Sequence, residues 1–76
     1  MTPARLVECL DLLHWTAETL AEVIECDPSL TEAWALGLTE IPPKAGAWIE
    51  VLALAHSAAE EGKPKGLKGK RYSVEH

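Results

Sequence analysis

The chain has 76 residues, so it holds one domain with one modest core, and a multi-domain enzyme is excluded. Hydrophobic residues make up 47% of the sequence, which is close to an ordinary globular protein and argues against wholesale disorder. The 12 acidic and 7 basic residues give a net charge of −5 at pH 7, the wrong sign for a protein that coats nucleic acid through bulk charge.

The charge is divided unevenly along the chain. Residues 1–61 carry eleven acidic and two basic side chains, a sum of −9, whereas residues 62–76 carry five basic side chains and one acidic side chain, a sum of +4. The sequence therefore predicts an acidic, apolar body followed by a basic tail.

Nothing in the sequence indicates a membrane-spanning or secreted protein. No run of about 18 apolar residues is present. The N-terminal stretch contains Glu8 and Asp11 and lacks a small-residue cleavage site, unlike a secretory signal. Cys9 and Cys26 do not form a CxxC pair, so we expect both to be reduced apolar fillers in a cytoplasmic protein.

Two helices are predicted before residue 27. In the first, Thr2 caps the start, Pro3 suits the first helical position, and the helix ends near Leu13 or His14. Thr16 is predicted to cap the second helix. The residues expected to form their apolar faces are Leu6, Cys9 or Leu10, and Leu13 in the first, and Leu20, Ala21 and Ile24 in the second.

The third predicted helix runs from Pro28 to Leu36, with Asp27 as its cap and Gly37 as the residue that ends it. Its inner face is expected to contain two large apolar side chains at i, i+4 spacing. These are Leu30 and Trp34.

The fourth and longest helix is predicted from Pro42-Pro43 to about Glu61, and it is apolar on more than one face. Ile49 and Leu54 are expected to lie away from its main apolar side. Either this helix is the most buried one, or a second apolar stripe contacts a partner, which predicts a homodimer through residues 44–61. The residues predicted to form the main apolar side are Trp48, Val51 or Leu52, Ala55 and Ala59.

These segments predict an all-α fold, a compact domain of four to five helices over residues 1–61. Residues 62–72 contain three glycines, one proline and five cations, which predicts a flexible basic tail. The last four residues, 73–76, have the composition of a cloning junction followed by the start of a purification tag, and no function is assigned to them.

An ordered set of residues lies between positions 2 and 60. It consists of Leu20-Ala21, Ile24, Thr31, Trp34, Gly37, Ile41-Pro42-Pro43 and Trp48-Ile49. This set resembles the helix-turn-helix domain of the lambda-repressor and Cro-like (XRE-type) regulators, especially small bacterial members. The resemblance implies a DNA-binding transcriptional regulator whose helix-turn-helix spans residues 16–37 and whose second motif helix enters the major groove. It also implies a homodimer, since one such module buries little surface on DNA.

Carried onto this chain, the resemblance makes Ser29, Glu32 and Ala33 the residues that face bases. Positive side chains outside the motif are the candidates for phosphate contacts. These are Lys44, Lys63, Lys65, Lys68, Lys70 and Arg71.

The motif departs from the family pattern in its turn and in its charge. Glu25 stands where the family usually has glycine, and Thr31 stands where it usually has valine. Residues 16–43 contain six acidic side chains and neither lysine nor arginine. The alternative function is therefore a protein-interaction domain that binds a basic partner through an acidic face made of Glu18, Glu22, Glu25, Asp27 and Glu32.

Other functional sites are not predicted. Trp15, Trp34 and Trp48 are expected to be core residues. His14 and His56 are separated in sequence by three predicted helices and have no carboxylate partner at ligand spacing, so no metal site and no cofactor are predicted. No nucleophile–base pair or glycine-rich phosphate loop is present, and the chain is not expected to be an enzyme.

Overall fold

The computed structural model describes residues 1–73, and these residues form four α-helices and no β-strand. The helices are α1 (Pro3–Leu13), α2 (Ala17–Ile24), α3 (Pro28–Leu36) and α4 (Pro43–Glu61). The predicted all-α class is confirmed, with four helices. Apart from Ser73, the segment predicted to derive from a tag lies outside the described residues.

Short-range hydrogen bonds set where three of the helices begin. The Thr2 hydroxyl accepts from the backbone N–H of Arg5, and the Thr16 hydroxyl accepts from that of Thr19, both with N···O distances of 3.1 Å. The Asp27 carboxylate accepts from the N–H of Ser29 at 2.8 Å. Each cap satisfies a backbone donor that the first turn of a helix leaves unpaired, so the predicted starts are confirmed.

Left-handed residues end the first three helices. His14, Glu25 and Gly37 have φ angles of 59°, 60° and 75°, and their backbone N–H groups donate to carbonyls of the preceding turn. Only the third of these positions is a glycine, the residue that adopts this conformation without steric cost.

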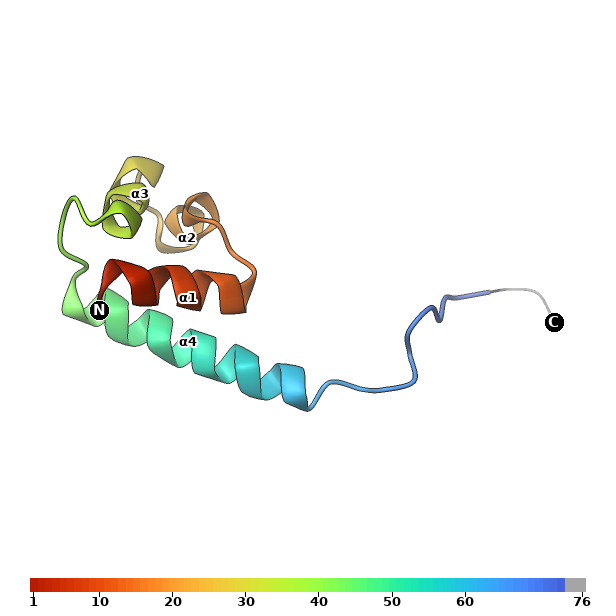
Figure 1. Ribbon diagram of the computed structural model, residues 1–76. Coiled ribbons are helices and arrows are strands. Elements are labelled where there is room, and N and C mark those ends of the chain that lie inside the picture. Colours follow the sequence, from red (N-terminus) through yellow and green to blue (C-terminus); the bar gives the residue numbers. More distant parts are fainter. Residues whose placement is uncertain (74–76) are drawn as a thin grey trace.

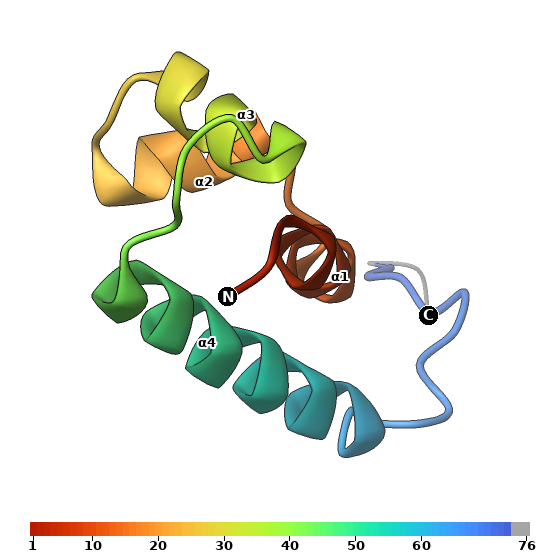
Figure 2. The same cartoon turned by 60° about the vertical axis from the view of Figure 1, so that its left-hand side comes forward.

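Helix α1 is the centre of the domain. Figure 2 views it nearly end-on, with α3 above it and α4 below it, and α2 packs against α3. One of the two alternatives given for α4 was that it is the most buried helix. The structure instead places α1 at the centre of the domain, between α3 and α4. The buried residues are Leu6, Cys9, Leu10 and Leu13 of α1, with Leu20, Ala21, Thr31, Trp34, Ile41, Gly46, Ile49 and Ala53.

The predicted core residues were wrong in part on α3 and α4. Ile49 is fully buried, whereas Trp48 is 38% exposed and Val51 63% exposed, so α4 turns the opposite face to the core. On α3, Leu30 is 41% exposed and Thr31 is fully buried in its place. Both helices carry apolar residues on several faces, so hydropathy alone does not select the buried one.

The cysteines and the remaining tryptophans follow the predicted pattern in part. Cys9 is buried, and its burial raises the pKa of its thiol, as expected for an inert apolar filler. Cys26 is only partly buried. Trp34 lies in the core, and Trp15 packs against the core while partly exposed.

Beyond Glu61 the chain leaves the helical body. Residues 62–73 are exposed and form no helix or strand, and they extend away from the far end of α4 (Figure 1). Over the described part of the chain, no helix combines the length and apolar character needed to cross a membrane.

Candidate functional surfaces

A hydrogen bond from the buried hydroxyl of Thr31 joins α3 to α2. Thr31 is fully buried, and its Oγ1 donates to the carbonyl of Ala17 at 2.8 Å and to that of Pro28 at 3.1 Å. Ala21, also fully buried, is small enough to allow the close approach of two helices. These contacts fix the inner face of α3 against α2 and leave its other face outward.

The predicted base-facing residues occupy this outer face only in part. Ser29 and Glu32 are exposed, whereas Ala33 is partly buried. Asp27 is exposed, but its carboxylate is engaged as the cap of α3. Hydrogen bonds from the side chain and the backbone of Ser29 lower the pKa of that carboxyl below its usual value.

The acidic face on α2 and α3 is fully exposed. All five of its carboxylates are exposed, and among residues 1–73 no ion pair joins any of them to a basic side chain. Carboxylates that are not neutralised by basic side chains attract cations and repel phosphate groups. The residues are Glu18, Glu22, Glu25, Asp27 and Glu32.

The predicted phosphate-contacting residues are not gathered beside α3. Lys44 is exposed in the first turn of α4, but the tail cations follow the opposite end of this helix (Figure 1). Lys63 already pairs with Glu60, at 3.1 Å between Nζ and Oε2. The structure thus brings Ser29 and Glu32 together on α3 and keeps them apart from the tail.

The exposed side of α4 forms an apolar stripe. Trp48, Val51 and Leu54 recur at three-residue spacing and are 38%, 63% and 63% exposed. We call these three residues the α4 stripe. Neighbouring apolar side chains of this size are unusual on a surface that meets only water.

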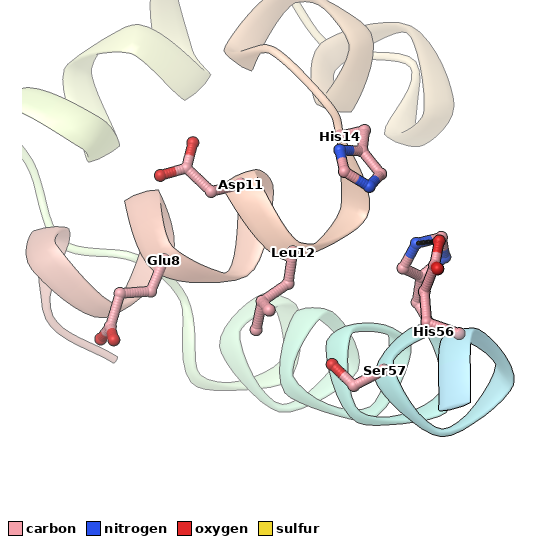
Figure 3. Close-up of a pocket in the computed structure, with 7 residues that line it drawn as sticks. Glu8, Asp11, Leu12, His14, His56 and Ser57 are labelled. Carbon is pink, nitrogen blue, oxygen red and sulfur yellow. Dashed lines mark ion pairs between the residues drawn. The ribbon is translucent and has the colours of Figure 1, made fainter.

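Three side chains that can bind a metal ion, two histidines and one glutamate, converge where α1 ends beside α4. The rings of His14 and His56 lie edge to face with centroids 5.6 Å apart, and Glu60 lies one turn after His56. Together with residues of α1 they line an open pocket of about 490 Å³ (Figure 3). The grounds for predicting no metal site were therefore wrong: the fold brings the histidines together and His56 has a carboxylate at i, i+4.

No family model matches the chain, and no curated protein or solved structure is significantly similar to it. What its surfaces bind must therefore be argued from their own geometry and charge. The His56–Glu60 spacing was visible in the sequence and could have indicated half of the histidine cluster. The contribution of His14 could not be found in this way, because it depends on how α1 packs on α4.

Proposed function

We propose that the chain is a DNA-binding transcriptional regulator of the helix-turn-helix class. The observation that carries this proposal is the pairing of α2 and α3, in which Thr31 anchors α3 while Ser29 and Glu32 face outward. In regulators of this class the second motif helix lies in the major groove, with its N-terminal residues on base edges. A glutamate such as Glu32 accepts a hydrogen bond from the amino group of cytosine.

In this proposal the phosphate contacts come from outside the motif. The eleven residues from 62 to 72 can span roughly 36 Å when extended, at about 3.3 Å per residue. That reach lets the tail follow a duplex backbone although it begins at the far end of α4. Five tail cations would give a slope of log K against log salt of at most about −4 to −5.

Fluorescence anisotropy with a mixed-sequence DNA duplex in roughly 50 mM salt tests this proposal. We expect binding at tens of micromolar protein and a steep loss of affinity with added salt. Replacing Lys63, Lys65, Lys68, Lys70 and Arg71 with glutamine should abolish most of the binding. The matched control, Ser29→Ala with Glu32→Ala, should change sequence preference and leave the salt slope nearly unchanged. Absence of binding by the unmodified chain would contradict the proposal.

The acidic face supports a second candidate function, which is contact with a basic protein. Its five exposed acidic residues form no ion pair with a basic side chain in residues 1–73, and they occupy the surface that a DNA-binding member of this class would place on the duplex. Charge complementarity of this kind accelerates association and selects the partner. A basic partner, such as the DNA-binding surface of another regulator, fits this face.

Charge reversal separates the two candidates. The variant Glu18→Lys/Glu22→Lys/Glu32→Lys should lose binding to a lysine- and arginine-rich helical peptide if the acidic face is a protein-contact surface, and still not bind DNA. If DNA binding is the function, the same variant should bind duplex more tightly, because repulsion from phosphates is removed. Unchanged binding of the basic peptide would rule out the protein-contact function.

We also propose that the α4 stripe pairs with its counterpart in a second copy of the chain. The stripe is apolar, and a two-fold axis would bring identical stripes together. Sedimentation that shows only monomer at high concentration would contradict the dimer.

A further inference from the structure

The cluster at the end of α1 contains a buried polar atom without a hydrogen-bonding partner. The Nε2 atom of His56 is buried, forms no hydrogen bond, and lies 3.6 Å from Oε1 of Glu60. Buried polar atoms are nearly always paired, so an unpaired imidazole nitrogen calls for a specific explanation. A bound metal ion would supply the missing partner.

The donor atoms of the cluster are close enough to share one ion. One donor atom each from His14, His56 and Glu60 lies within 4.8 Å of the other two. Metal–ligand bonds of about 2.0–2.2 Å place tetrahedral ligand atoms roughly 3.3–3.6 Å apart, so the cluster needs only a modest contraction. His14 is exposed at a helix end and Glu60 is exposed, so both side chains have room to move.

The ligand types favour a zinc ion. Two imidazoles and one carboxylate form a set that Zn²⁺ binds in proteins, with a fourth position left for water or another ligand. Hard ions such as Mg²⁺ prefer oxygen ligands and bind poorly to imidazole. We propose that His14, His56 and Glu60 bind a Zn²⁺ ion that joins the end of α1 to the last turns of α4.

Surrounding charges act on the site in opposite directions. Glu8 and Asp11 line the same pocket and make its field more negative, although Figure 3 shows their carboxylates pointing away from the histidines. Lys63 pairs with Oε2 of Glu60 and leaves Oε1 on the side of His56. Its positive charge weakens cation binding, so Lys63→Gln should bind zinc more tightly than the unmodified chain.

Isothermal titration with ZnCl₂ and thermal unfolding with and without zinc test the site on the full chain under reducing conditions. Zinc should bind once per chain and raise the melting temperature, because ligands that bind only the folded state stabilise it. Mg²⁺ should have neither effect. Residues that merely orient a metal ligand change affinity by roughly 10–100-fold when mutated, so loss of a direct ligand should weaken binding at least about tenfold.

The variants are chosen so that each one still folds. His14→Gly removes one ligand at a left-handed position that glycine adopts readily, and Glu60→Gln keeps the shape of an exposed side chain. Both should lose the zinc response, whereas His76→Ala, the matched control for the third histidine of the sequence, should keep it. Zinc binding by His14→Gly as tight as that of the unmodified chain, or its loss in His76→Ala, would overturn the proposal.

Discussion

Glu25 adopts a left-handed conformation in the turn between α2 and α3, with φ at 60° and ψ at 42°. The Cβ atom of an L-residue crowds the carbonyl oxygen in this conformation, at a cost of about 1–2 kcal/mol. The resemblance proposed from the sequence predicts a glycine at this position, and Glu25 stands in its place. The backbone N–H groups of Glu25 and Cys26 both donate to carbonyls of α2, and these bonds hold the turn in this conformation.

Replacing Glu25 with glycine should therefore stabilise the domain. Part of the relieved strain is offset by the greater chain entropy of glycine in the unfolded state, so we expect a gain of about 0.5–1 kcal/mol. Urea denaturation followed by tryptophan fluorescence would measure it. Glu25→Gln removes the charge and keeps the Cβ atom, so it should not reproduce the gain; equal effects of the two variants would point to charge and not to strain.

At the scale of the element, α4 has two apolar faces, and either could have packed against the core. Arg5 of α1 makes two hydrogen bonds of 2.7 Å with Glu50, and Gly46 allows Met1 to approach closely. These contacts orient the helix so that Ile49 enters the core and Trp48 does not.

Alanine substitution on the two faces should have contrasting effects. Ile49→Ala removes a fully buried side chain and should cost about 2–5 kcal/mol, a large fraction of the stability of so small a domain. Trp48→Ala should change the stability of the monomer much less and shift sedimentation toward the monomer. Denaturation curves and sedimentation velocity check both expectations, and equal destabilisation by the two substitutions would contradict the observed orientation of α4.

At the scale of the whole molecule, the Arg5–Glu50 ion pair joins the first helix to the last. Its carboxylate and guanidinium are both partly exposed, and Arg5 also approaches Glu8 at 3.9 Å. The hydrogen bonds from Arg5 lower the pKa of the Glu50 carboxyl below its usual value of 4.5 and raise the pKa of the guanidinium. Most acidic side chains of the chain lie in residues 1–61, whereas most basic side chains lie in the tail. The Arg5–Glu50 ion pair is therefore one of the few places where an acidic side chain of residues 1–61 is neutralised by a basic side chain of the same segment.

The lowered pKa of Glu50 predicts how stability depends on pH. Because the folded state holds this carboxyl ionised more strongly than the unfolded state does, its contribution is complete above about pH 4.5 and disappears as the pH falls through the folded value. Glu50→Gln should be less stable than the unmodified chain at pH 7, and the difference should shrink below about pH 4.5. Denaturation at a series of pH values measures the difference, with the exposed Glu61→Gln as a control; a difference that stays constant down to pH 2 would contradict the assignment.

The sequence by itself determined where the helices begin and end, because the residues that start and end a helix act on backbone groups only three or four residues away. Thr2, Thr16 and Asp27 cap the backbone beside them, and the prolines and Gly37 act on their own φ angles, so no distant contact is needed. It also determined the separation of an acidic body from a basic tail, since composition does not depend on the fold.

Only the tertiary structure decided which faces of α3 and α4 are buried and which side chains meet, whereas the buried faces of α1 and α2 follow the sequence pattern. Ile49 and Trp48 are both apolar, and the packing of α4 against α1 decides between them. Thr31 is buried instead of the more hydrophobic Leu30, and its hydroxyl donates a hydrogen bond to the carbonyl of Ala17. The meeting of His14 with His56 and Glu60 has the same origin. It depends on the angle and register of α1 on α4, which are set by contacts between residues far apart in sequence. The hydrophobic effect is not directional, so the apolar pattern of each helix does not specify how two helices meet.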